Sequence, residues 1–207
     1  MRVRIPKQER SRERRLRIME AGLALFAQKG MNGTSSNEIA QRAGVSIGTF
    51  YSYFENKKAL FLELLKDHLE NFISGIYTLE PDYTVPMREI ISSHILKAFT
   101  VFNVDPSFHK EALVLKFSDP EVKRLFDEVE QEQLAIISSL LEHYGKNSNR
   151  RDLQAVSKVV HSAVENVAHY VKFLEYPMDR DRLIEELTEM IYHYVNSLSS
   201  GKGERVA

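Results

Sequence analysis

The chain has 207 residues, no cysteine, and 28 basic against 29 acidic residues. This length is enough to bury a hydrophobic core, and the absence of cysteine excludes disulfides and thiolate chemistry, so we expect a reducing compartment such as the cytoplasm. The longest apolar run, AGLALFA, is far below the roughly 20 residues of a membrane span, and residues 1–17 are too basic for a signal peptide. We therefore expect a protein that is neither exported nor inserted into a membrane.

Charge is distributed unevenly along the chain. Residues 1–57 carry 11 Lys+Arg and 5 Asp+Glu, a net of +6, whereas the remaining residues carry 17 and 24, a net of −7. A cationic N-terminal segment followed by an acidic remainder indicates a polyanionic partner that meets the N-terminal segment alone.

The first 17 residues, MRVRIPKQERSRERRLR, contain eight basic and two acidic residues. One interpretation of this basic arm is a disordered extension that aids solubility. The other is a set of arginines that reach the minor groove or the flanking phosphates of DNA. The sequence leaves both interpretations open.

Helical spacing of apolar residues dominates the chain, and this pattern predicts an all-α protein. A first helix is expected from about Arg14 to Lys29, where Gly30 ends it. After two short helices, a long connecting helix is expected from Asn56 to about Ile76. Further helices are expected near 87–103, 106–116, 120–144, 151–175 and 180–198.

The stretch SSNEIAQRAGVSIGTFYSYFENKKAL predicts two short helices on either side of Gly44. Ser35 and Glu38 form a capping box that begins the first of them. Ser46 caps the next helix two residues after Gly44, so the turn between the helices is tight. This arrangement predicts a helix-turn-helix.

The third helix is expected to expose a polar and aromatic surface that suits a DNA groove better than a core, formed by Ile47, Gly48, Thr49, Tyr51, Ser52 and Tyr53. The N-terminal turns of such a helix can touch base edges in the major groove. Gly48 costs roughly 1 kcal/mol of helix propensity relative to alanine, and close approach of the helix to DNA would account for it. Lys57, at the start of the connecting helix, is expected to reach a backbone phosphate.

From Arg14 to about Leu65, through ALFAQKGMNGTSSNEIAQRAGVSIGTFYSYFENKKAL, the sequence resembles the TetR family of bacterial transcriptional regulators. The resemblance implies a homodimeric repressor that binds a double-stranded DNA operator through paired third helices and a small-molecule effector through its C-terminal helical domain. By position, it assigns DNA contacts to Ser36, Asn37, Ser46, Ile47, Gly48, Thr49, Tyr51, Ser52, Tyr53 and Lys57.

The chain departs from the family pattern at two places. Many relatives carry a basic residue at the position of Ile47, and a histidine is common around Ser52 or Tyr53. The missing charge implies fewer phosphate contacts from the third helix. We expect residues 1–56 to form the basic arm and the helix-turn-helix DNA-binding domain, residues 57–199 the helical ligand-binding and dimerisation domain, and residues 200–207 a flexible tail.

The last two expected helices, near 151–175 and 180–198, have wide apolar faces. The first carries a second apolar row of Val164, Ala168 and Val171 beside its heptad stripe. The heptad stripe consists of Leu153, Val156, Val160, Ala163, Val167, Tyr170 and Leu174. Two apolar sides on one helix predict that one side packs within the protomer and the other against a second copy. An intramolecular hairpin is the alternative.

His161, Glu165 and His169 follow one another at i+4 spacing. At 1.5 Å per residue the two histidines are about 12 Å apart, so the three side chains cannot ligate one metal ion. We interpret them as a solvated or pocket-edge polar face, and we expect no metal and no cofactor. Catalytic motifs are also missing from the sequence, so we do not expect an enzyme.

The middle of the chain is rich in aromatic residues, on helices that relatives use to line a ligand cavity. Most are expected in an ordinary core, and some near an apolar or aromatic effector, from the set His94, Phe99, Phe102, Phe108, Leu113 and Phe117. The sequence thus favours a repressor that such an effector releases from DNA. The alternatives are an architectural or chromosome-organising DNA-binding protein without an effector, and an enzyme or metal sensor built on residues 161–169.

Overall fold

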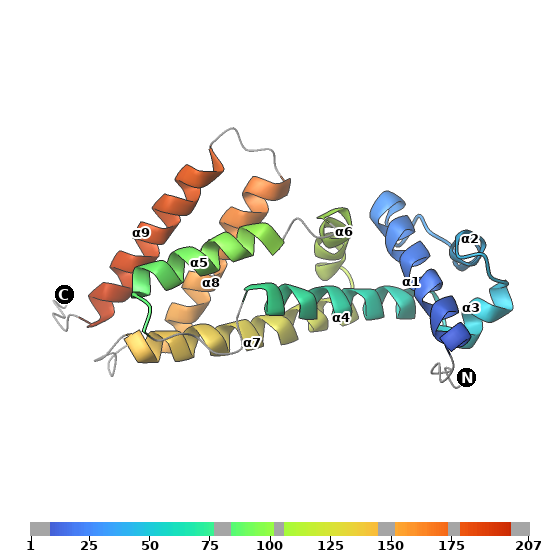
Figure 1. Ribbon diagram of the computed structural model, residues 1–207, viewed down its shortest axis with the longest axis horizontal. Coiled ribbons are helices and arrows are strands. Elements are labelled where there is room, and N and C mark those ends of the chain that lie inside the picture. Colours follow the sequence, from blue (N-terminus) through green and yellow to red (C-terminus); the bar gives the residue numbers. More distant parts are fainter. Residues whose placement is uncertain (1–8, 77–83, 102–105, 145–151, 174–178, 200–207) are drawn as a thin grey trace. The chain divides into compact units, whose positions relative to one another are not determined.

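The computed structural model describes residues 9–76, 84–101, 106–144, 152–173 and 179–199. These residues form nine α-helices and no strand (Figure 1), namely α1 (Glu9–Lys29), α2 (Ser36–Arg42), α3 (Ile47–Tyr53), α4 (Lys57–Ile76), α5 (Met87–Val101), α6 (Pro106–Lys116), α7 (Pro120–Tyr144), α8 (Leu153–Phe173) and α9 (Arg180–Ser199). The expected all-α fold is confirmed. Across these described ranges, each helix is either too short or too polar to cross a membrane.

Local capping signals set several helix boundaries. Asp119 Oδ1 accepts hydrogen bonds from the backbone N–H groups of Glu121 and Val122, at 2.9 and 3.3 Å, directly before α7 begins at Pro120. Asp179 caps the start of α9 in the same way. Helices that begin at such signals start where the sequence predicts.

The first helix begins five residues earlier than expected. α1 starts at Glu9 instead of near Arg14, and Ser11 is buried with its hydroxyl 2.6 Å from the Tyr53 hydroxyl. This contact joins the first turns of α1 to α3, residues far apart in the sequence. Residues 1–8 of the basic arm lie outside the described residues, so both interpretations of the arm stay predictions.

The contacts group the chain into two compact units. Unit 1 comprises residues 1–70 and 104–127, and unit 2 comprises residues 71–103 and 128–207. Helices α4 and α7 therefore each contribute residues to both units. The expected domain boundary after residue 56 stays a prediction. The contacts place α6 in the same unit as the helix-turn-helix.

Unit 1 has an aromatic core formed by three phenylalanines. Phe26, Phe61 and Phe108 are fully buried, with ring centroids 5.3 Å apart in the first pair and 5.1 Å apart in the second. Gly22 allows the close packing of α1 on α4, because a Cβ atom there would lie 2.6 Å from Leu60 Cδ2 and the leucine side chain would have to shift. The core thus joins α1, α4 and α6.

A second contact in unit 1 ties α6 to the end of α1. Glu111 Oε1 on α6 accepts a hydrogen bond from the backbone N–H of Met31 at 2.8 Å. The adjacent Gly30 has φ of +73°, and a Cβ atom there would lie 2.8 Å from the same carboxylate oxygen. Glycine at this position therefore allows both the turn and the approach of Glu111.

Unit 2 has a mainly aliphatic core in which α5 packs against α8 and α9 (Figure 1). The buried residues that form it are Ile95, Phe99, Leu141, Val156, Ala168, Ile184, Leu187, Ile191, Val195 and Leu198. At the edge of this core, Arg88 of α5 donates from Nε to Glu189 and from Nη2 to Glu185, both at 2.6 Å. These ion pairs reinforce the contact of α5 with α9.

Candidate functional site

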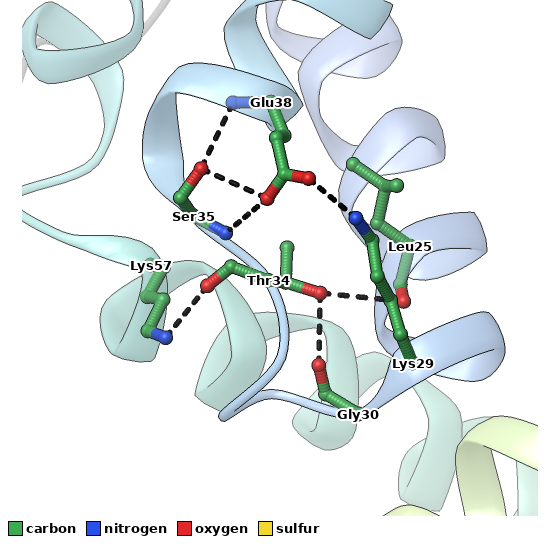
Figure 2. A network of polar contacts seen from close by, with 7 residues as sticks. All are labelled: Leu25, Lys29, Gly30, Thr34, Ser35, Glu38 and Lys57. Carbon is green, nitrogen blue, oxygen red and sulfur yellow. Dashed lines mark hydrogen bonds and ion pairs between the residues drawn. The ribbon is translucent and has the colours of Figure 1, made fainter.

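The start of α2 is held by a polar network that reaches back to α1 (Figure 2). Ser35 Oγ accepts from the backbone N–H of Glu38 at 3.2 Å, and Glu38 Oε2 accepts from the backbone N–H of Ser35 at 2.8 Å. The predicted capping box is confirmed. Lys29 of α1 pairs with the same carboxylate. The Lys29 hydrogen bond, followed by those from Ser35, lowers the pKa of Glu38 from 4.5 to about 2.

Lys57 is bound to the turn that precedes α2. Its Nζ donates to the carbonyl oxygen of Met31 at 2.8 Å and to that of Thr34 at 2.6 Å, the second of which Figure 2 shows. Thr34 is itself buried, and its hydroxyl donates to the Gly30 carbonyl at 2.8 Å. Two of the three N–H bonds of Lys57 are thus engaged within the protein. A phosphate contact through the third N–H stays a prediction.

The turn between α2 and α3 is closed at Gly44. Its φ of +65° lies in the left-handed region that favours glycine. Ser46 then caps α3, because its Oγ accepts from the backbone N–H of Thr49 at 3.1 Å. The expected tight turn and the expected cap of the third helix are both confirmed.

Helix α3 buries one side and exposes the other. Phe50 is fully buried, whereas Ile47 and Tyr51 expose 37% and 41% of their surface. Gly48 is exposed, and the nearest neighbour of a Cβ atom built there would be Ser46 Oγ at 3.9 Å. The fold of unit 1 therefore leaves space for a side chain at position 48.

The expected exposure of Tyr53 is wrong. Tyr53 is only 3% exposed, and its hydroxyl bonds to Ser11. A tyrosine suits a groove and a core alike when the core supplies a partner for its hydroxyl, and here Ser11 supplies it. The other residues assigned to DNA contact are exposed or half-buried, and their role stays a prediction: Ser36, Asn37, Ser46, Ile47, Gly48, Thr49, Tyr51, Ser52 and Lys57.

Arg17 is a cation beside the helix-turn-helix that the sequence analysis did not single out. Its Nη1 lies 3.6 Å from the position a Cβ atom on Gly44 would take, and its side chain is exposed. Arg42, at the end of α2, is also exposed. The basic composition of residues 1–17 indicates cations near the helix-turn-helix. The structure shows that Arg17 is the one that reaches the turn at Gly44.

Unit 2 contains a cavity between α5, α7, α8 and α9, with Ile76 at its edge. Its walls are mainly aliphatic: Met87, Ile90, Ile91, Ile95, Ala98, Ile137, Leu140, Leu141, Val160, Val164, Ile191 and Val195. The remaining lining residues carry polar groups: His94, Gln133, Tyr144, His161 and Glu165. An apolar cavity with a few polar groups is typical of a small-molecule site.

Two polar residues of α8, His161 and Glu165, lie at the cavity wall. His161 is 7% exposed, and its Nε2 lies 2.7 Å from Gln133 Oε1. Its Nδ1 lies 3.8 Å from Glu130 and 3.9 Å from Glu165. The solvated face expected for His161 is therefore wrong, whereas the pocket-edge interpretation describes His161 and Glu165 correctly. His169 is half-buried and lies outside the described cavity lining.

Of the six residues expected near an effector, His94 lies in the described lining of the cavity. Phe99 is part of the buried core of unit 2, and Phe108 and Leu113 belong to α6 in unit 1. Phe117 exposes 89% of its surface, and Phe102 lies outside the described residues. The structure does not gather this set into one site, because aromatic content does not reveal which core a helix joins.

The two last helices expose large apolar side chains. Val159 and Tyr170 on α8 expose 60% and 47% of their surface, and Met190 on α9 exposes 53%. The same helices bury residues such as Ala168 and Ile191 in the core of unit 2. Each helix thus has an apolar side toward the core and apolar residues on its surface.

Comparison with known proteins identifies the helix-turn-helix. Residues 18–64 match the family model described as bacterial regulatory proteins, tetR family. Over 200 residues the chain is 27% identical to the uncharacterized HTH-type transcriptional regulator YerO of Bacillus subtilis (strain 168). The aligned residues cover 91% of this chain and 65% of that protein. The chain thus spans less than two thirds of the length of that relative.

Two further comparisons cover most of the chain. It is 27% identical over 139 residues to the fatty acid metabolism regulator protein of Bacillus subtilis (strain 168), covering 64% of this chain and 69% of that protein. The structure of the fatty acid degradation regulator FadR from Bacillus halodurans shares the fold, with a TM-score of 0.60, 21% identity, and coverage of 97% and 100%.

All three of these proteins are named as regulators and not as enzymes. The matched residues 18–64 include the capping box at Ser35, the turn at Gly44 and the exposed side of α3 described above. Residues 18–64 therefore carry the N-terminal domain of the TetR family of bacterial regulatory proteins.

Proposed function

We propose that this protein is a cytoplasmic, homodimeric DNA-binding repressor that a small apolar effector releases from its operator. The observation that carries the proposal is the exposed side of α3, where Ile47, Gly48 and Tyr51 face outward from a helix fixed by its caps. The N-terminal turns of such a helix can enter a major groove of DNA. Exposed Arg17 and Arg42 add positive charge beside it for the phosphates.

The exposed apolar residues of α8 and α9 support pairing of two protomers through these helices. A second copy would cover the exposed Val159, Tyr170 and Met190. Dimeric helix-turn-helix proteins bind half-sites about 34–36 Å apart, so the pairing would fix the distance between two α3 helices.

The cavity of unit 2 supports the release step. Its described walls are aliphatic and lack Phe, so they favour an aliphatic effector over an aromatic one. The relatives named for fatty acid metabolism and degradation agree with a hydrocarbon chain as part of the effector. An effector that prefers the state unable to bind the operator by about 1–3 kcal/mol would weaken operator binding about 5- to 150-fold.

Selection of bound fragments from the host genome tests the DNA-binding part of the proposal. We expect a few sites with near-palindromic sequence, whereas uniform binding along the genome would favour the architectural alternative. Tyr51→Ala should then weaken binding to a selected site by about 5- to 150-fold, because a base contact is worth about 1–3 kcal/mol. Phe117→Ala, which removes an exposed aromatic ring from the turn directly after α6, is the matched control.

Two results would contradict the proposal. The first is a folded, dimeric Tyr51→Ala protein that binds the selected site as tightly as the unchanged protein at physiological salt. The second is a molecule that binds tightly in the cavity of unit 2 and leaves operator affinity unchanged.

A further inference from the structure

The cavity of unit 2 is apolar, but its formal charge is negative. Among its described lining residues, Glu165 is an acidic side chain, and the lining contains no lysine or arginine. Glu165 follows His161 by one helical turn on α8, and its Oε2 lies 3.9 Å from His161 Nδ1. A carboxylate therefore stands at the wall of a mainly aliphatic space.

Two cations of unit 2, on α8 and α5, are paired with other carboxylates. Lys158 pairs with Glu130, and Arg88 binds Glu185 and Glu189 at the edge of the core. Neither cation belongs to the described lining of the cavity. The charge of Glu165 is thus not balanced by either of them.

The two histidines of the cavity wall have different surroundings. Burial lowers the pKa of His94 below its ordinary value of 6.5, so its imidazole is neutral at pH 7. His161 donates from Nε2 to Gln133, while its Nδ1 faces two carboxylates, Glu130 and Glu165.

We propose that Glu165 makes this cavity selective for apolar molecules with a cationic nitrogen group, and against apolar carboxylates. The inference rests on the effector site proposed above and names the chemical class of its ligand. An ammonium group can donate charge-assisted hydrogen bonds to the Glu165 carboxylate. A carboxylate ligand would meet like charge at Glu165, whose side chain is 33% exposed and lies at a mainly aliphatic wall.

Three probes with the same hydrocarbon chain test this selectivity: octylamine, octan-1-ol and octanoate. Their dissociation constants for the full chain are measured by isothermal titration calorimetry at pH 7. We expect octylamine to bind most tightly and octanoate most weakly, with about a tenfold or larger difference between them.

The variant Glu165→Gln keeps the shape of the side chain and removes its charge. It should weaken octylamine binding, strengthen octanoate binding, and leave octan-1-ol within about twofold, because only a ligand in the cavity responds to this side chain. Glu186→Gln, which removes an exposed carboxylate of α9 outside the described cavity lining, is the matched control and should leave the preference intact. Circular dichroism spectra and melting temperatures establish that both variants are folded.

The outcomes separate this inference from the proposed function. Octanoate binding as tightly as octylamine, a preference unchanged in Glu165→Gln, or no binding of the three probes would each overturn the selectivity. Operator affinity with each bound probe is measured in parallel. Octanoate that binds tightly and releases the operator would overturn the selectivity alone, whereas octylamine that binds through Glu165 without changing operator affinity would overturn the release step alone.

Discussion

The helix-turn-helix of unit 1 and the cavity of unit 2 are stabilised by different kinds of contact. Around α2 and α3, short helices are fixed by directional hydrogen bonds from Ser35, Ser46 and Lys57. Around the cavity, most lining side chains are aliphatic and pack without preferred direction. A surface that reads DNA has to keep one shape, whereas a cavity that admits an apolar molecule benefits from side chains that can repack.

The largest expected difference between the two regions comes from truncating large apolar side chains. Phe26→Ala should lower the free energy of unfolding by about 3–5 kcal/mol, because Phe26 is fully buried against Phe61. Ile137→Ala should cost less than the roughly 2–5 kcal/mol of a buried isoleucine, because Ile137 is half-buried and already borders a cavity. Urea unfolding followed by circular dichroism measures both. Equal losses would show that the two regions are packed alike.

Removing the Lys57 ammonium group should have the next largest effect. Lys57→Met leaves the carbonyl groups of Met31 and Thr34 without their charged donor and should cost about 1.5–3 kcal/mol of unfolding free energy. The matched change Lys58→Met removes ion pairs with Asp119 and Glu121 and should cost about 0–1 kcal/mol.

Salt dependence separates the two roles of Lys57. We expect Lys57→Met to reduce the slope of log affinity against log salt by about 0.9, as one lost phosphate contact would. An unchanged slope together with weaker binding would limit Lys57 to holding the turn before α2.

Gly48→Ala should separate stability from DNA binding. Because a Cβ atom fits at this position, the change should raise the unfolding free energy by about 0.5–1 kcal/mol. Operator affinity should nevertheless fall, since the helix backbone would no longer approach the DNA as closely. Gly44→Ala is the contrasting control: its left-handed φ of +65° should make the change destabilising by about 1–2 kcal/mol. Unchanged operator affinity in Gly48→Ala would contradict the close approach.

The smallest expected effect is the pH dependence of the capping box. The pKa of Glu38 is about 2 in the folded protein against 4.5 ordinarily, so its stabilisation is complete above pH 4.5 and is lost as the pH falls toward 2. Glu38→Gln should remove this part of the pH dependence of unfolding, and Glu55→Gln, a change of another exposed carboxylate, should retain it. A Glu38 pKa near 4.5 in an NMR titration would contradict the capping contacts.

The sequence predicted the features that depend on neighbouring residues. The capping box of Ser35 and Glu38, the turn at Gly44 and the cap at Ser46 each involve side chains within a few residues of the backbone groups that they fix. For the same reason the later helices were placed within a few residues of their observed ends.

Features that depend on distant residues were not predicted. The burial of Tyr53 depends on Ser11, 42 residues away, and the burial of His161 depends on Gln133 of another helix. The cavity lining combines residues of α5, α7, α8 and α9, so aromatic content alone could not select it. Periodicity gives the faces of a helix but not the helix that each face meets.

Gly30 illustrates how two independent constraints restrict one position. Its left-handed φ disfavours a side chain, and the carboxylate of Glu111 occupies the place where a Cβ atom would stand. In a saturation library, Glu111→Ala would remove the neighbouring carboxylate but would not allow more amino acids at position 30, because the left-handed φ of that residue would remain. The backbone conformation of residue 30 therefore restricts substitution there even when the space next to Glu111 is freed.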